Sequence, residues 1–297
     1  MSWYNNSKDY WRKAIQAVAS EKHRNRQMVE KDVVQSFFLS EISKNNSSLV
    51  FKGGTSLSKA FLLIDRFSED IDLSADHKLT EAERKTIYQL ITRTAEKMGF
   101  VLLNEENVQP RYTYNKYIFK YPSVFEDNQE IIIETNFYQI SFPIETKEIH
   151  SLVGDFYEET GTAIPAQAKV LKFNMKVQTL ERTFVEKVFA ICDYRIQNMQ
   201  ERDSRHLYDI AKLIDEAKMD ESFAELINKV RQERAKYQNH PSAKKEINIT
   251  KMLEEIIKSE FYKQDYEVIT SRLLYEEYSY NQAIDNGIAK LVALHIF

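Results

Sequence analysis

Two short stretches of the sequence carry residue types that could handle a phosphate and a divalent metal. Lys52-Gly53-Gly54-Thr55 contains two of the six glycines in 297 residues, and Asp70-Ile71-Asp72 follows shortly after it. Adjacent glycines allow a sharp turn and let a phosphate approach main-chain N–H groups that a Cβ would block. In an extended strand Asp70 and Asp72 share one face, and two anions held this close repel each other unless a cation lies between them. Together the two stretches predict phosphoryl or nucleotidyl transfer.

Each stretch also has a simpler interpretation. An Asp-x-Asp triplet in a strand is often a solvated face, and the same triplet occurs in unrelated metal-dependent glycosyltransferases and phosphatases. The glycine pair could be a plain helix-start turn, although such a turn explains one glycine better than two. The interval between them has room for one helix of about ten residues and a return strand, which would bring the acids beside the glycine turn.

A third carboxylate would strengthen a metal site, because hard divalent ions prefer several oxygen ligands. Glu134 follows Ile131-Ile132-Ile133 in an otherwise apolar strand, where a lone carboxylate is costly to bury. The open alternative is an edge-strand acid that faces solvent. We predict Asp70, Asp72 and Glu134 as the metal ligands.

The elements that must position these residues alternate between helix and strand. The patterns predict helix through the first 45 residues, a strand at 49–51, a helix capped by Thr55-Ser56 that runs through Ile64, a strand at 70–73, a helix from a Thr80/Glu83 capping box to about Gly99, and strands at 111–121 and 130–138. From about Leu180 the pattern is helical to the end. The predicted fold class is α+β, with a nucleotidyltransferase-like α/β core and mixed sheet at 1–175, including the N-terminal helices, and a helical domain at 176–297.

Composition limits the function classes. Apolar residues make up 43% of the chain and aromatic residues 12%, which supports a real core, while a net charge of −4 leaves room for only a local polyanion site. The single cysteine, Cys192, excludes an internal disulfide and reads as a buried thiol in a reducing compartment. The start of the chain lacks a signal sequence, and no apolar run approaches the roughly 20 residues of a membrane span. We expect a cytoplasmic protein without membrane association.

The helical half holds two further charged stretches, Glu181–Lys187 and Ser204–Ile210. Their pattern alone predicts two surface helices with solvated charges. The functional alternative is a Lys or Arg that reaches a triphosphate, since phosphates need cationic partners as negative charge shifts during transfer.

In this order the motifs resemble the AbiEii/AbiGii toxin family, nucleotidyltransferases of the polymerase-beta-like superfamily. The resemblance spans roughly residues 45–215 and rests on Lys52–Thr55, Arg66–Leu73, Glu181–Lys187 and Ser204–Asp209. It implies that the following residues form the site: Gly53, Gly54 and Thr55 cradling the triphosphate; Arg66, Ser68 and Lys187 contacting the nucleotide; Asp70 and Asp72 holding magnesium; and Asp209 positioning or activating the acceptor. His206 stands where many relatives carry Asp, so the resemblance implies no direct catalytic role for it.

The resemblance also implies partners. The family acts as the toxin of two-gene toxin–antitoxin and phage-defence (abortive infection) systems, adding nucleotides to RNA, notably the acceptor end of tRNA. We therefore expect a nucleoside triphosphate, Mg²⁺ or Mn²⁺, an RNA acceptor and a cognate antitoxin encoded nearby. Two basic clusters could bind the RNA backbone, although solvated helix faces are the alternative: Lys22, Arg24, Arg26 and Lys31, and Arg231, Arg234, Lys236, Lys244 and Lys245 around Tyr237.

Two rival functions stay open. One is nucleotidyl transfer to a protein or a small molecule such as an antibiotic, which needs an open acidic or apolar acceptor pocket. The other is a non-catalytic module that binds nucleotide. The intact acid pair argues against that module, because a pure binder gains nothing from the mutual repulsion of two carboxylates.

Overall fold

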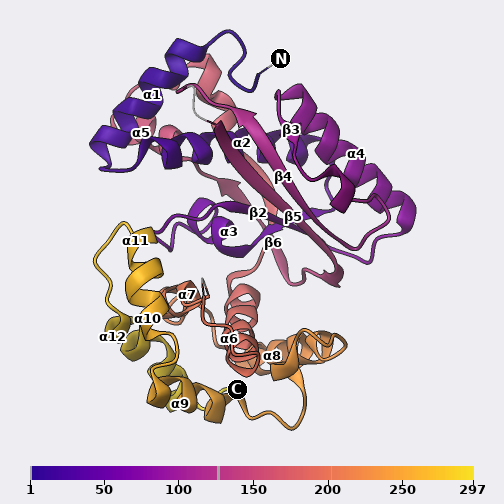
Figure 1. Ribbon diagram of the computed structural model, residues 1–297, viewed down its shortest axis with the longest axis vertical. Coiled ribbons are helices and arrows are strands. Elements are labelled where there is room, and N and C mark those ends of the chain that lie inside the picture. The colour runs from indigo at the N-terminus through magenta and orange to yellow at the C-terminus, as the bar shows by residue number, and fades with distance from the viewer. Residues whose placement is uncertain (1, 126–127, 202) are drawn as a thin grey trace. The chain divides into compact units, whose positions relative to one another are not determined.

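The computed structural model describes residues 2–125, 128–201 and 203–297, which form two compact units (Figure 1). The first unit holds the chain up to Ala60 together with Ser68–Gln178, and the second holds Phe61–Phe67 together with Thr179–Phe297. The chain therefore leaves the first unit for a short excursion between the glycine turn and the acid pair. We call Phe61–Phe67 the excursion segment.

The first unit is built on a seven-stranded sheet with the order β3-β4-β5-β2-β1-β7-β6. Strand β2 is parallel to β5 and β1 is parallel to β7, while the other neighbouring pairs are antiparallel. The mixed sheet that the sequence predicts is thus confirmed. The strands are β1 (Leu49–Lys52), β2 (Asp70–Ala75), β3 (Val101–Leu102), β4 (Tyr114–Pro122), β5 (Asn128–Ile140), β6 (Ile144–Ile149) and β7 (Phe173–Gln178).

Helices cover one face of this sheet. Tyr88 of α4 packs on Tyr117 of β4, and Phe38 of α2 stacks on Phe100, which in turn meets Phe119. Side chains on the covered face are buried, whereas their neighbours along each strand, which face the other way, are more exposed. The helices of this unit are α1 (Lys8–Glu21), α2 (Arg26–Asn45), α3 (Gly53–Lys59), α4 (Glu81–Lys97) and α5 (Leu152–Glu159), with 3₁₀ turns η1 (Glu105–Asn107) and η2 (Ala166–Leu171).

Local sequence signals set some boundaries correctly and one incorrectly. The capping box forms as predicted: the Thr80 hydroxyl accepts from the Glu83 N–H, and the Glu83 carboxylate accepts from the Thr80 N–H. The predicted Thr55-Ser56 cap is wrong, because α3 already begins at Gly53 and ends at Lys59. Gly53 has φ +78°, a value that residues with a side chain rarely adopt. This glycine lets the chain turn directly from strand to helix, two residues before the predicted cap.

The sequence patterns did not predict strands β3, β6 and β7. β7 pairs in parallel with β1, its neighbour in the sheet though not in the sequence, and its buried and more exposed residues alternate over only part of its length. A six-residue segment of this kind carries a weak periodic signal compared with the long helix that follows it.

The second unit is helical. Helix α6 lies against α7, α8 and α9, and 11 of its residues are buried. The excursion segment adds a short extended bridge: the Phe67 N–H donates to the Leu273 carbonyl and the Tyr275 N–H donates to the Asp65 carbonyl, both at 2.9 Å. The helices are α6 (Leu180–Ile196), α7 (Arg205–Leu213), α8 (Glu221–Arg234), α9 (Ile249–Ser259), α10 (Lys263–Asp265), α11 (Ser271–Leu273), α12 (Tyr280–Ala283) and α13 (Ala289–Leu294), with the 3₁₀ turn η3 (Pro241–Ala243) and two π-helical turns, η4 (Tyr266–Thr270) and η5 (Ile284–Ile288).

Candidate active site

The acid pair lies on the face of the sheet that α2 and α4 leave open. Asp70 and Asp72 are half-buried, while Ile71 between them is fully buried. Asp72 faces Lys52 on β1 and Glu134 on β5, and Glu134 in turn faces Lys116 on β4. Directly opposed residues on one face of a sheet are close neighbours. The site is therefore a row of four charges, two acidic and two basic, that crosses four adjacent strands.

The glycine turn lies directly against this row. A Cβ on Gly53 would come within 1.9 Å of the Asp72 Oδ2 atom and 2.8 Å of its carboxyl carbon. No real Cβ can occupy such a position without displacing the carboxylate. The sequence brings the two motifs near one another, and the structure places them in contact.

The contact predicts a sharp effect for a minimal change. Gly53→Ala should lower transferase activity by at least about 100-fold, because the methyl group must push Asp72 aside and because an L residue at this φ is strained. Gly161→Ala is the matched control, since Gly161 also has a positive φ but has open space around it. Steady-state transfer assays on both variants test this, and equal activities would show that the close approach has no role in the reaction.

Thr55 and Ser68 brace the turn from behind. The Thr55 hydroxyl hydrogen-bonds to the Asp70 carbonyl at 2.5 Å and lies 2.8 Å from the Ser68 hydroxyl, and its residue is 1% exposed. A role of Thr55 in binding phosphate would therefore fall to its backbone N–H.

Gln35 of α2, which the sequence interpretation missed, donates to the carbonyls of Ser68 and Glu69. A buried glutamine on an apolar helix stripe was the available signal.

The donor set fits a hard cation, because Mg²⁺ prefers carboxylate oxygens and the acid pair supplies them from one strand face. Among residues 2–125, 128–201 and 203–297, no three His, Cys, Asp or Glu side chains gather as a cluster that could hold a metal. Glu134 is paired instead with Lys116, whose Nζ lies 3.1 Å from Oε1. The role of Glu134 as a third ligand stays a prediction.

The second unit contains a buried ionic cluster built from the other predicted site residues. Arg66 of the excursion segment donates from Nε and Nη2 to the two carboxylate oxygens of Asp209, at 2.7 and 2.8 Å. Lys187 of α6 donates to Asp209 Oδ2 at 2.7 Å. Asp209 is 0% exposed, Arg66 4% and Lys187 6%. Burial by itself would raise the pKa of Asp209, but the charges of Arg66 and Lys187 outweigh it and hold that pKa well below its usual range.

The prediction of two surface helices with solvated charges is wrong for these residues, because their charged groups are buried against one another. The guanidinium of Arg66 is largely committed within its own unit, with a third hydrogen bond to the Phe67 carbonyl. The nucleotide contacts of Arg66 and Lys187, and the approach of Lys187 and Asp209 to the acid pair, stay predictions.

His206 completes the cluster as a neutral group. Its Nδ1 lies 3.3 Å from Lys187 Nζ, and its ring stacks on Tyr194 with the planes 16° apart. Since Lys187 is a donor, Nδ1 accepts and the proton of the neutral ring resides on Nε2. Burial and then the charge of Lys187 place the pKa of His206 well below its ordinary 6.5.

This depressed pKa predicts how stability depends on pH. Below pH 6.5 the unfolded chain binds a proton on His206 that the folded protein does not, so the free energy of unfolding should fall as the pH falls, by up to about 1.4 kcal/mol per unit. His206→Gln should remove that part of the slope. Urea unfolding of both proteins between pH 5 and 7.5 measures the difference, and identical slopes would contradict a buried neutral imidazole.

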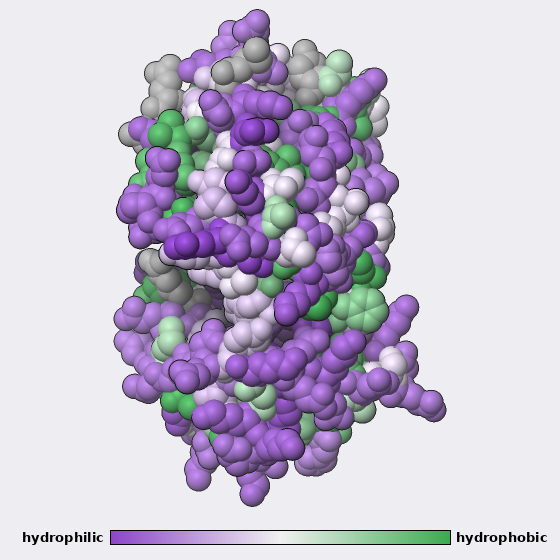
Figure 2. Space-filling view, turned by 90° about the vertical axis from the view of Figure 1, so that its right-hand side faces the viewer, coloured by the Kyte–Doolittle hydropathy of each residue, from purple (hydrophilic) through white to green (hydrophobic). Residues whose placement is uncertain are grey.

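Several side chains of the two predicted basic clusters are paired with acidic side chains of the same chain. Lys22 pairs with Glu159, Lys31 lies 3.7 Å from Glu69, and Arg234 is buried against Asp193. Polar side chains cover most of the face shown in Figure 2, and its hydrophobic side chains lie in small separate groups. The RNA role of these clusters stays a prediction.

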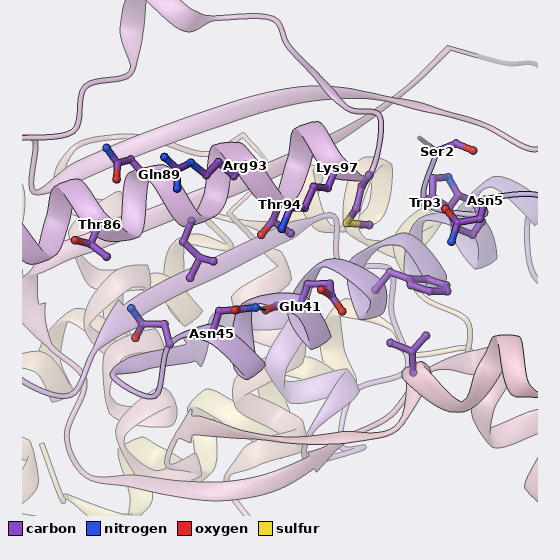
Figure 3. A pocket seen from close by; sticks show the side chains of 15 residues that line it. Ser2, Trp3, Asn5, Glu41, Asn45, Thr86, Gln89, Arg93, Thr94 and Lys97 are labelled. Atoms are coloured by element: carbon purple, nitrogen blue, oxygen red, sulfur yellow. Dashed lines mark hydrogen bonds between the residues drawn. The ribbon is translucent and has the colours of Figure 1, made fainter.

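A pocket of about 530 Å³ lies elsewhere in the first unit (Figure 3). Glu41 and Asn45 of α2 and Arg93 and Lys97 of α4 line it, together with residues near the N-terminus. None of the predicted site residues contributes to its wall, so the pocket is separate from the acid pair.

No helix in the described part of the chain is long and apolar enough to cross a bilayer.

Comparison with known proteins identifies the family. The model of the nucleotidyl transferase AbiEii toxin family, of type IV toxin–antitoxin systems, matches residues 38–286. Among solved structures, MenT4, a nucleotidyltransferase toxin from Mycobacterium tuberculosis H37Rv, is 18% identical, with 93% of this chain and 98% of that chain covered and a TM-score of 0.48. No protein with a curated description matches the sequence. The family match includes the glycine turn, the acid pair, Lys187 and Asp209, and the chain belongs to the AbiEii family of nucleotidyltransferase toxins.

Proposed function

We propose that this toxin transfers a nucleoside monophosphate from a nucleoside triphosphate to an RNA acceptor, the 3′ end of tRNA, in a magnesium-dependent reaction. The acceptor hydroxyl oxygen attacks the α-phosphorus, the bond from that phosphorus to the bridging oxygen breaks, pyrophosphate leaves and the hydroxyl proton is released. The arrest of translation that follows is relieved by the antitoxin of the same system.

One observation carries the proposal: the turn at Gly53 lies so close to Asp72 that a Cβ on Gly53 would overlap the Asp72 carboxylate. A turn that can accept phosphate oxygens at its N–H groups and an acid pair that can hold a divalent ion are thus adjacent within one compact unit. A triphosphate bound at the turn would place its negative charge next to two carboxylates, an arrangement that is favourable only with a cation between them.

The chain's own residues have distinct tasks in this reaction. Gly53 and Gly54 bind the triphosphate through the backbone, and Thr55 and Ser68 keep the turn fixed to the start of β2. Asp70 and Asp72 would hold Mg²⁺, which when bound stabilises the charge that develops between nucleophile and leaving group. In the second unit, Asp209 orients Lys187, whose ammonium supplies positive charge to the nucleotide phosphates.

Incubation of the protein with each labelled nucleoside triphosphate and total RNA tests the proposal. We expect one triphosphate to label RNA in the size range of tRNA, only when Mg²⁺ or Mn²⁺ is present. The variant Asp70→Asn provides the control for contaminating transferases. Label in protein or in small molecules, with none in RNA, would support the rival transfer reactions, and nucleotide binding without any transfer would support a non-catalytic module.

A further inference from the structure

Exposed aromatic and basic side chains continue the row of charges onto β4. Tyr114, the first residue of that strand, is 44% exposed, and Tyr112 just before it is 41% exposed. Arg111 is also exposed, and the Lys116 side chain is 43% exposed. The segment Arg111–Lys116 thus has two exposed rings between two cations. We call this segment the tyrosine strip.

The tyrosine strip adjoins the acid pair. Lys116 faces Glu134 across β4 and β5, and Glu134 faces Asp72 across β5 and β2. Tyr114 lies one step further along β4 on the same face, since alternate residues of a strand point the same way. Burial, the charge of Glu134 and a hydrogen bond with Glu134 raise the pKa of Tyr114 above its usual value. The ring is therefore anchored at the edge of the acid row while much of its surface stays open.

The sheet order gives the strip a side. The glycine turn follows β1, on one side of β2, whereas the strip is on β4, two strands away on the other side. In phosphoryl transfer the attacking and the leaving oxygens lie on opposite sides of the phosphorus. When the phosphates of a triphosphate rest on the Gly53 turn, the side of the acid pair towards β5 and β4 is therefore open to the acceptor.

The chemistry of the strip fits a single-stranded nucleic-acid end. Aromatic rings bind unpaired bases by stacking and neighbouring cations bind the backbone, whereas bases inside a duplex are already stacked. We infer that Tyr114 is the stacking site for the terminal base of a single-stranded RNA acceptor, with Lys116 beside it for the phosphate backbone. This inference rests on the proposed function and names the residues that would recognise its acceptor.

A ring-specific substitution tests the inference. Tyr114→Ala should weaken binding of a short labelled single-stranded RNA, measured by fluorescence anisotropy, and raise the KM for RNA, each by about 5- to 100-fold. Affinity for the triphosphate should stay at the wild-type value. Tyr114→Phe keeps the ring and loses the hydroxyl, so it should bind RNA about as well as the wild type. The same RNA with its end base-paired should bind more weakly and should be insensitive to Tyr114→Ala.

Controls separate the possible failures. Lys85→Ala removes an exposed lysine from α4, which covers the opposite face of the sheet, and should leave RNA binding unchanged, so the wild-type affinity is not a general charge effect. Wild-type RNA binding by Tyr114→Ala, or an equal loss in Tyr114→Phe, would overturn the stacking role. If the wild-type protein labels no RNA at all, the proposed function itself fails. If wild type and Tyr114→Ala label RNA equally well, only this inference fails.

Discussion

Asp72→Asn should lower the rate of nucleotidyl transfer by at least about 1000-fold, equivalent to roughly 4 kcal/mol of lost transition-state stabilisation, while the protein stays folded. Asp72 faces Lys52 and Glu134 and touches the Gly53 turn, so its carboxylate is the one that any bound triphosphate must share space with. The amide keeps the size of the side chain and removes the charge that holds the metal. Single-turnover assays with saturating triphosphate measure the chemical step directly.

The melting temperature of Asp72→Asn and the activity of a control variant show whether the loss of transfer is specific to the acid pair. Removing one of two like charges relieves repulsion with Asp70, so the melting temperature should stay at or above the wild-type value. Glu130→Gln, an exposed acid on β5 that faces Lys120, should leave transfer unchanged. Activity of Asp72→Asn within tenfold of wild type would refute the acid pair as the catalytic centre.

Asp209→Ala should destabilise the second unit by about 3–5 kcal/mol, because it leaves the guanidinium of Arg66 and the ammonium of Lys187 buried without their counter-charge. The family resemblance implies that Asp209 positions or activates the acceptor, and this role stays a prediction. In the structure its fully buried carboxylate accepts three hydrogen bonds from its two cationic neighbours. The stabilisation should be present at neutral pH and should weaken as the pH falls below 3.8, the ordinary aspartate value, towards the depressed value of the folded state.

Two comparisons separate the buried ion pair from general effects. Asp215→Ala removes an exposed pair with Lys290 in the same unit and should cost less than about 1 kcal/mol. The triple variant Arg66→Met, Lys187→Met, Asp209→Leu replaces the whole buried cluster with apolar groups and should regain most of the lost stability but no activity. Urea unfolding gives the free energies, and a loss below about 1 kcal/mol for Asp209→Ala would contradict the structural role.

Local chemistry decided what could be predicted from the sequence. The capping box of α4, the strand before the glycines and the acid-bearing strand were predictable because each depends on residues a few positions apart. Asp70 and Asp72 could be selected because two nearby carboxylates on a strand are hard to explain without a cation.

Long-range partners could not be predicted in this way. The resemblance places Arg66 at the nucleotide, yet its carboxylate partner Asp209 stands 143 residues away in the sequence, within the same second unit. Tyr114 was predicted only as a strand residue, since a period-two pattern gives the orientation of a side chain and not its neighbours. Its position beside Glu134 depends on the register of β4 on β5.

The excursion segment limits how the protein can be truncated and how its two units can recombine in evolution. Because residues 61–67 are held by a bridge to Leu274 in the second unit, the chain passes between the units three times, and no single cut separates them. A truncation after Gln178 would strip the excursion segment of its bridge and of the Asp209 partner of Arg66, and Asp70 follows only a few residues later. Such a toxin cannot acquire a new helical half as a cassette by one recombination event. The two units are expected to evolve as a single heritable block, with the residues between the glycines and the acids changing in step with α7.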